Sequence, residues 1–196
     1  MDAVVQRTID ELVGAAERHD AGKENRLDRW RVLDPDAGRF VWFLAQAAQA
    51  RVIVEVGTSR GVSTLWLADA ARTTGGRVLS IDTDADAQGH ARRSVTTAGL
   101  ADHVDFRVDD GGVALADLAD GAVDLLFLDA ERTEYPSWWP HPVRVLRTGG
   151  VLVVDNALSH PAEIEPVRDL LERDGRLSVT TIPVGKGELV ALRNAG

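Results

Sequence analysis

The feature that most constrains the fold of this chain is a series of short apolar segments separated by longer amphipathic stretches. The apolar segments are rich in Val, Ile and Leu and lie at residues 52–56, 77–81, 104–108, 123–128 and 151–154. The stretches between them have helical periodicity and lie at residues 62–72, 85–98, 113–118 and 135–146. Apolar strands that alternate with helices are typical of a parallel sheet covered on both faces. The pattern therefore predicts a doubly wound, Rossmann-like α/β fold.

The last part of the chain predicts a different connection. Two strand-like segments, residues 177–184 and 188–193, are separated only by Gly185, Lys186 and Gly187. A short glycine-rich turn between two strands is typical of an antiparallel hairpin. We therefore expect a sheet of seven strands, mostly parallel, with an antiparallel terminal strand.

The N-terminal part precedes this sheet. Residues 2–19 and 37–50 have helical patterns, and a charged, irregular segment that includes Trp30 lies between them. With 196 residues the chain has the length of one domain. We expect a single domain in which residues 37–196 form the α/β core and residues 1–36 form either a lid or a dimer surface.

The composition argues against several classes of protein. There are 22 Lys and Arg residues against 31 Asp and Glu residues, a net charge of −9, and such a surface repels the phosphate backbone of nucleic acids. The chain has no cysteine, which excludes disulfides and thiolate metal sites. Its longest apolar stretch, residues 40–45, is far shorter than the roughly 20 residues of a membrane helix. We expect a cytoplasmic protein with no nucleic-acid or membrane partner.

A glycine-rich loop follows the first predicted strand. Glu55 precedes Gly57 by two residues, and Gly61 opens the next helix, so the pattern is G-x-x-x-G rather than the dinucleotide fingerprint G-x-G-x-x-G. Glycines let a ligand approach the backbone, and the helix N-terminus offers free N–H groups. An acid beside the loop suits a cationic or hydroxyl-bearing ligand. The alternative is a tight turn without a ligand.

Further acids follow the second and third predicted strands. Asp82 is placed to accept hydrogen bonds from the hydroxyls of a ribose, although Asp82 or Asp84 could instead cap a helix. Asp109 and Asp110 could meet an adenine edge, and helix capping is again the alternative.

Several segments carry a family resemblance. They are residues 34–38, 124–132 with Tyr135, 146–156 and 182–187. Together with the glycine loop, they resemble the class I S-adenosylmethionine-dependent methyltransferases, and in particular the metal-dependent O-methyltransferases that include catechol and caffeoyl-coenzyme A O-methyltransferase. The likeness covers residues 32–193. It implies S-adenosylmethionine as cofactor, bound among Leu33, Glu55, Gly57, Thr58, Ser59, Gly61, Ser63, Asp82, Asp109, Asp110 and Asp129.

The resemblance also implies a divalent cation, usually Mg²⁺. Its ligands would be Asp129, which ends the fourth strand, and Asp155 with Asn156, which end the fifth. Adjacent parallel strands bring such groups to one edge of the sheet, and their oxygens are the hard ligands that Mg²⁺ prefers. The alternative is that each of these residues only caps a turn.

One departure from the family concerns the proton acceptor. The family has a lysine three residues after the fourth-strand acid, and this chain has Arg132 there, which cannot act as a base at neutral pH. Either the metal alone lowers the pKa of the hydroxyl while Arg132 stabilises the oxyanion, or a histidine, His160 or His141, takes the proton. The catalytic candidates are Asp129, Arg132 and His160.

The expected reaction is methyl transfer to a hydroxyl of a small acceptor, an aromatic vicinal diol. Trp138 and Trp139 could stack on a planar acceptor or belong to the core. The alternatives to this reaction are a metal-independent methyltransferase, in which Arg132 orients an acceptor carboxylate, and a non-catalytic cofactor-binding protein. The family resemblance also allows a homodimer.

Overall fold

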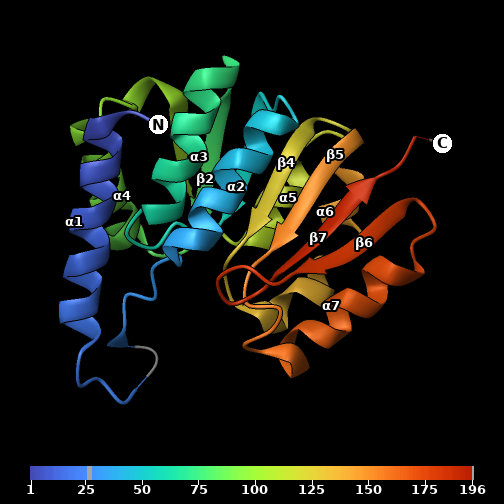
Figure 1. Cartoon of the computed structure of the whole chain (residues 1–196). Helices are drawn as coiled ribbons and strands as arrows, with labels where there is room; N and C mark the ends of the chain where they lie inside the picture. Colours follow the sequence, from blue (N-terminus) through green and yellow to red (C-terminus); the bar gives the residue numbers. More distant parts are fainter. Residues whose placement is uncertain (26–27, 196) are drawn as a thin grey trace.

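A computed structural model describes residues 1–25 and 28–195 of the chain. Its centre is a seven-stranded sheet with the order β3-β2-β1-β4-β5-β7-β6 (Figure 1). The strands are β1 (Val52–Val56), β2 (Arg77–Asp82), β3 (Val104–Val108), β4 (Val123–Leu128), β5 (Leu146–Val154), β6 (Leu177–Ile182) and β7 (Glu188–Arg193). Strands β1 to β5 are parallel, and β7 is antiparallel to both of its neighbours. The prediction of a mostly parallel sheet with an antiparallel terminal strand is confirmed.

Helices cover both faces of this sheet. One core contains residues of α1 (Ala3–Asp20), α2 (Pro35–Ala47), α3 (Val62–Thr74) and α4 (Ala85–Thr97). The other contains residues of α5 (Gly111–Asp117), the 3-10 helix η3 (Arg132–Trp138), α6 (His141–Arg144) and α7 (Pro161–Arg173). A short 3-10 helix, η2 (Ala101–His103), precedes β3. Ile53 belongs to the first core and its neighbour Val54 to the second, because successive strand residues point to opposite faces.

The prediction of one helix over residues 135–146 is wrong. Residues 132–138 form η3, α6 has only four residues, and β5 begins at Leu146 rather than at Val151. Prolines at positions 136, 140 and 142 explain the break, because proline has no backbone N–H to donate within a helix. No helix was predicted between β5 and β6, where the structure has α7.

The strand registers bring the ends of four strands to one edge of the sheet. Val56 at the end of β1 pairs with Ile81 of β2 and with Leu128 of β4. Leu128 pairs in turn with Val154 of β5. Because β7 is antiparallel, its first residues lie at this same edge, where Leu189 pairs with Val154. Loops that are far apart in the sequence therefore meet here, at the carboxyl edge of the sheet.

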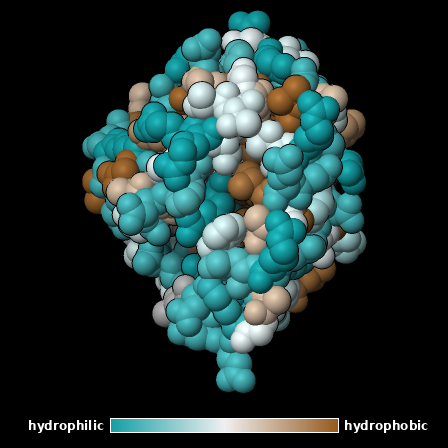
Figure 2. All heavy atoms as spheres, turned by 90° about the vertical axis from the view of Figure 1, so that its left-hand side faces the viewer, coloured by the Kyte–Doolittle hydropathy of each residue, from teal (hydrophilic) through white to brown (hydrophobic). Residues whose placement is uncertain are grey.

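The N-terminal helix α1 packs against α3 and buries Val5 and Ile9. The side of the molecule shown in Figure 2 is mostly hydrophilic, with scattered hydrophobic side chains. Within the described residues, no helix is both long enough and apolar enough to span a membrane. The role of residues 1–36 as a lid or a dimer surface stays a prediction.

The packing of α2 on α3 generates a first prediction. A Cβ atom added at Gly38 would lie 2.2 Å from Nε1 of Trp66, which is wholly buried. We therefore expect Gly38→Ala to lower the free energy of unfolding by about 1–3 kcal/mol, measured by urea denaturation. Gly89→Ala in α4 is the control, because its nearest heavy atom is the end of Arg93 at 3.8 Å. An equal effect of the two substitutions would contradict the close packing.

Candidate active site

A cavity of about 460 Å³ opens at the carboxyl edge of the sheet. Six predicted cofactor residues lie on its wall: Gly57, Ser59, Asp82, Asp109, Asp110 and Asp129. The predicted metal and catalytic residues also lie there: Asp129, Arg132, Asp155, Asn156 and His160. The fold thus brings most of the predicted site residues around one space.

The glycine loop is held between β2 and β4 by close backbone contacts. The N–H of Gly57 donates to the carbonyl of Ile81 at 2.8 Å, and the N–H of Asp129 donates to the carbonyl of Val56 at 2.9 Å. A Cβ at position 57 would lie 2.2 Å from the carbonyl oxygen of Asp129, and φ of Gly57 is 106°. Only glycine fits this position, because other residues rarely adopt such a φ and have no room here.

Asp82 fixes the same loop from the end of β2. Its Oδ2 accepts hydrogen bonds from the N–H groups of Thr58 at 2.8 Å and Ser59 at 2.9 Å. Its Oδ1 accepts from the N–H of Asp84 at 3.0 Å. The carboxylate therefore shapes the loop, and because Oδ1 accepts only one of these hydrogen bonds it can still accept another from a ligand in the cavity. Its predicted contact with a ribose stays a prediction.

Glu55 lies beneath the loop and not on the cavity wall. Its side chain is wholly buried, and its Oε2 accepts from Thr64 Oγ1 at 2.6 Å and from Ser80 Oγ at 2.5 Å. Burial raises the pKa of Glu55 to about 7. Glu55 therefore does not reach the cavity, and its predicted part in binding the cofactor stays a prediction. Four other predicted cofactor residues, Leu33, Thr58, Gly61 and Ser63, are also absent from the cavity wall.

The two acids after β3 have local partners. The guanidinium of Arg107 donates to Asp109 Oδ2 from Nε at 2.9 Å and lowers the pKa of Asp109. Asp110 is the N-cap of α5, where its Oδ1 accepts from the N–H of Val113 at 2.9 Å. The capping alternative is therefore correct for Asp110. Both residues still line the cavity, so a contact with an adenine stays a prediction.

The three predicted metal ligands lie together. Nδ2 of Asn156 donates to Asp155 Oδ2 at 2.6 Å and lies 3.3 Å from Asp129 Oδ1. Burial and the neighbouring Asp155 carboxylate hold the pKa of Asp129 well above its usual value. Within the described part of the chain, no three His, Cys, Asp or Glu side chains are arranged to hold a metal ion. The amide oxygen of Asn156 would have to be the third protein donor.

Arg132 is buried, and its guanidinium pairs with an acid on α7. Nε of Arg132 donates to Glu163 Oε2 at 2.8 Å, and its Nη2 lies 2.6 Å from the same oxygen. This ion pair joins η3 to α7. His160, the residue before α7, lies on the cavity wall with its Nδ1 2.9 Å from Ser159 Oγ. The catalytic roles of Arg132 and His160 stay predictions.

Trp138, at the end of η3, lines the cavity beside α5. It is 5% exposed and packs against Gly111 and Gly112, where an added Cβ would lie 2.7 and 2.5 Å from its ring. Its ring centroid lies 5.1 Å from that of Tyr135. The alternative that Trp138 belongs to the core is therefore correct, although Trp138 also lines the cavity.

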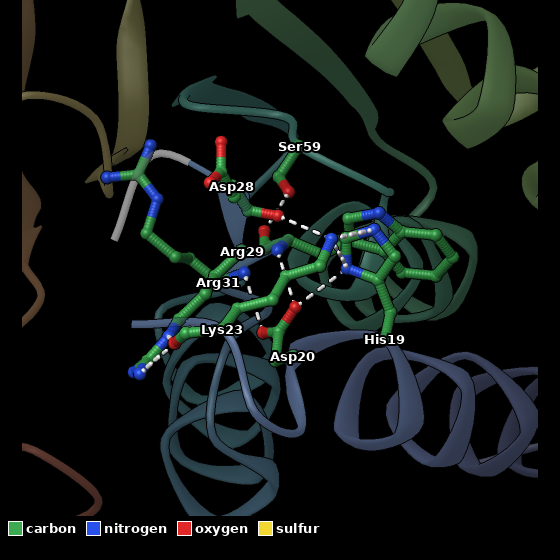
Figure 3. Close-up of polar contacts among 8 residues, drawn as sticks. His19, Asp20, Lys23, Asp28, Arg29, Arg31 and Ser59 are labelled. Carbon is green, nitrogen blue, oxygen red and sulfur yellow. Dashed lines mark hydrogen bonds and ion pairs between the residues drawn. The ribbon is translucent and has the colours of Figure 1, made fainter. Parts of the chain in front are cut away.

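A segment before α2 forms another wall of the cavity. We call residues 28–33 the strap, and Arg29, Trp30, Arg31 and Val32 of the strap line the cavity. Oγ of Ser59 donates to the carbonyl of Trp30 at 2.7 Å, so the strap is tied directly to the glycine loop (Figure 3). The Trp30 ring stacks on the His19 ring, with 4.3 Å between their centroids. The guanidinium carbon of Arg60, a residue of the glycine loop, lies 4.6 Å from the centroid of the Trp30 ring.

Asp20, the last residue of α1, and Lys23, which follows the helix, hold the strap in this position. Asp20 Oδ1 accepts from the N–H of Trp30 at 2.8 Å. Nζ of Lys23 reaches His19 Nε2 at 2.7 Å and donates to the carbonyl of Asp28 at 2.9 Å (Figure 3). Sequence patterns did not predict this network, because it depends on contacts between side chains and backbone carbonyls of irregular segments.

Two residues of the β6–β7 turn were also not predicted as site residues. Lys186 lines the cavity, and its positive charge partly offsets the raised pKa of Asp129. Glu188 is wholly buried at the start of β7. Burial and the carboxylates of Asp155 and Asp129 raise the pKa of Glu188 to about 10. The sequence feature that could have indicated Glu188 is its position as the one acid at the start of a mostly apolar strand.

A doubly wound sheet with a glycine loop after β1, an acid after β2 and a reversed β7 defines the Rossmann-like methyltransferase fold. Residues 9–194 match the family model described as O-methyltransferase. A relative from Mycobacterium sp. (strain KMS), named as an O-methyltransferase, is 34% identical over 191 residues, which are 89% of this chain and 85% of the relative. The chain belongs to the O-methyltransferase family, which confirms the predicted resemblance.

Solved structures agree with this assignment. The O-methyltransferase from Bacillus cereus in complex with SAH has 25% identity and a TM-score of 0.79, covering 99% of this chain and 92% of that one. The O-methyltransferase TomG from Streptomyces achromogenes, in complex with SAM, has 27% identity and a TM-score of 0.77, covering 100% of this chain and 91% of that one.

The buried position of Glu55 generates a prediction about pH. Its raised pKa means that the folded protein binds this proton more tightly than the unfolded chain, where the pKa is 4.5. The stability that this proton contributes is present below pH 4.5 and is lost as the pH rises to about 7. Between pH 4.5 and 8, the wild type should lose on the order of 3 kcal/mol of its free energy of unfolding through this group. Glu55→Gln should not show this loss, as measured by urea denaturation.

The exposed Glu172 of α7 provides the control. Glu172→Gln should keep the pH dependence of the wild type. If Glu55→Gln also kept it, the raised pKa of Glu55 would be wrong.

Proposed function

We propose that this chain transfers the methyl group of S-adenosylmethionine to a hydroxyl of a small acceptor, and that a divalent cation assists the transfer. The observation that carries the proposal is the close contact between Gly57 and Asp129. The glycine loop, where the cofactor would bind, thus lies against Asp129, which would be the first acid of the cation site. In the family, both components act on one substrate, so their proximity is what the reaction requires.

The donor set of the cation site fits a hard divalent cation. Asp155 is buried and Asp129 half-buried, and burial together with the repulsion from Asp155 keeps the pKa of Asp129 high. A bound dication would relieve this repulsion, and carboxylate and amide oxygens are suitable ligands for Mg²⁺. Such an ion supplies Lewis-acid activation of a hydroxyl bound to it. A vicinal diol on an aromatic ring, which can bind a cation through two oxygens, is the acceptor that this site would suit best.

The other residues have supporting parts in this proposal. Asp82 and the loop that it holds would bind the ribose and methionine parts of the cofactor. The strap closes one side of the cavity and would limit access of water. Arg132 cannot accept a proton and is paired with Glu163, so it would position η3 beside the site. His160 remains the candidate proton acceptor, because it lies on the cavity wall.

The cofactor part of the proposal predicts an effect of Asp82. Asp82→Ala removes the acceptor of two loop N–H groups and the proposed ribose contact, so we expect the Kd for S-adenosylmethionine to rise at least about tenfold in titration calorimetry. Asp84→Ala is the matched control, because Asp84 caps α4 through Asp86 and Ala87 and does not line the cavity. It should leave the Kd within about twofold while costing about 1 kcal/mol of stability. An unchanged Kd in Asp82→Ala would exclude the role of Asp82.

The cation part predicts an effect of Asp155. Methyl transfer to a simple catechol should depend on Mg²⁺ in the wild type and stop in excess chelator. Asp155→Ala should lose the Mg²⁺-stimulated rate and should no longer bind Mn²⁺ in calorimetry, while its affinity for S-adenosylhomocysteine stays close to that of the wild type. Full activity of this variant, or of the wild type in chelator, would favour the metal-independent alternative.

A further inference from the structure

Two basic side chains on the cavity wall have no part in the proposed function. Among the described residues, four Arg and Lys residues line the cavity: Arg29, Arg31, Arg132 and Lys186. Arg29 donates from Nε to the carbonyl of Lys23 at 2.8 Å, and Arg132 pairs with Glu163. Within the part of the chain that the structure describes, the side chains of Arg31 and Lys186 have no hydrogen bond or ion pair. Their charged groups are therefore available to a ligand.

The strap presents Arg31 in an unfavourable backbone conformation. Its φ is 49°, in the left-handed region that residues with a side chain rarely adopt. Asp20 holds this conformation, because its carboxylate accepts from the N–H groups of Trp30 at 2.8 Å and Arg31 at 3.4 Å. The Arg31 side chain extends away from Asp20 and His19 (Figure 3). The backbone is thus strained and fixed while the guanidinium stays unpaired, and such strain is concentrated at ligand-binding sites.

The turn between β6 and β7 holds Lys186 in an equally defined position. The carbonyl of Lys186 accepts from the N–H of Leu158 at 3.0 Å, and a Cβ at Gly187 would lie 2.5 Å from Cγ of Leu158. On the other side of Lys186, a Cβ at Gly185 would lie 3.3 Å from Oδ1 of Asp34, the residue that follows the strap. The turn therefore packs directly against the chain where the strap ends.

These two basic side chains lie nearer to the opening of the cavity than the proposed ligands of the divalent cation. Arg31 and Lys186 are exposed, whereas Asp155 is buried and Asp129 is half-buried. Lys186 is close enough to Asp129 for its charge to act on the pKa of that acid. An acceptor whose hydroxyls reach a cation at Asp129 would therefore extend past Lys186 towards the opening.

We propose that Arg31 and Lys186 form an anion subsite for the acceptor, and that the acceptor of this chain is a diol that carries a carboxylate. The planar guanidinium of Arg31 can bind a carboxylate through two N–H groups, and the ammonium of Lys186 adds a second positive charge. Glu131 and Glu134 line the cavity from η3 and its N-cap, so the strap and the turn form the side on which a carboxylate is favoured. This inference rests on the proposed function, because it describes the far end of the acceptor whose hydroxyl is methylated.

The first test is titration calorimetry on the protein saturated with S-adenosylhomocysteine and Mg²⁺. The probes are 3,4-dihydroxybenzoate and catechol, which share the diol and differ in the carboxylate. We expect the wild type to bind 3,4-dihydroxybenzoate at least about tenfold more tightly than catechol, and Arg31→Gln to lose at least about tenfold of this preference. Lys186→Gln should lose part of the preference. Arg31→Lys should retain part of it, because it keeps the charge but not the two-pronged geometry.

Arg51→Gln is the matched control, because Arg51 is also exposed but precedes β1 at the opposite edge of the sheet. It should keep the preference of the wild type. The cofactor has a carboxylate of its own, so the Kd for S-adenosylhomocysteine is measured in each variant. That Kd should stay within about twofold in Arg31→Gln. A tenfold rise would assign Arg31 to the cofactor and overturn the acceptor subsite.

Charge reversal tests the subsite in the reaction itself. Arg31→Glu should lower kcat/KM for 3,4-dihydroxybenzoate at least about a hundredfold relative to kcat/KM for 3,4-dihydroxybenzylamine, because it reverses the sign of the subsite. The change should appear in KM rather than in kcat, since the reacting hydroxyls meet the same groups as before. An equal loss for both acceptors would mean that Arg31 has only a structural role.

The outcomes separate the inference from the proposed function. If the wild type methylates both diols and binds them equally, the proposed function stands and the anion subsite is overturned. If it binds 3,4-dihydroxybenzoate through Arg31 but methylates neither diol, the subsite stands and the proposed reaction fails. If it binds neither probe, the diol acceptor and its carboxylate are excluded together.

Discussion

The backbone contact between Gly57 and Asp129 is the constraint on which the rest of the site depends. The loop after β1 and the acid after β4 approach so closely that there is no space for a side chain at position 57. Because β1 and β4 are neighbours in the sheet, their hydrogen bonds determine the position of both groups at once. Asp82 then holds the rest of the loop from the other side. The proposed cofactor and cation sites are in this way parts of one rigid edge and not two separate loops.

Charge divides this edge into two regions. On the cofactor side, Asp82, Asp109 and Asp110 accept hydrogen bonds from backbone N–H groups or from Arg107, so their charges are compensated within the protein. Around the proposed cation ligands, burial and the mutual repulsion of Asp129, Asp155 and Glu188 raise the pKa of Asp129 and of Glu188. Arg132, the nearby guanidinium, is engaged by Glu163 and does not relieve this repulsion. The two regions therefore differ in how the protein compensates its acids, by hydrogen bonds and Arg107 in the first and by raised pKa values in the second.

Much of this arrangement could be predicted from sequence, and the parts that could not have physical reasons. The apolar segments identified all seven strands, and parallel pairing then brought Asp129, Asp155 and Asn156 to one edge. The region of residues 135–146 was misassigned because its helical periodicity outweighed Pro136, Pro140 and Pro142. Glu55 follows the expected motif, yet it does not reach the cavity. The position of Glu188 beside Asp155 was not predicted because it depends on the register of β7 against β5. The strap was not predicted because its backbone carbonyls hold it in place, and no local sequence pattern indicates such contacts.

The position of β7 has a consequence for the time at which the site can form during synthesis. This strand follows β6 in the chain but lies between β5 and β6 in the sheet, so β6 has no strand to pair with until β7 is made. Lys186 and Glu188 arrive with it. A nascent chain on the ribosome can therefore hold the complete glycine loop while the part of the cavity wall formed by Lys186 has not yet been made. The site is completed only when β7 pairs with β5 and β6, so a partly synthesised chain does not yet have a complete site.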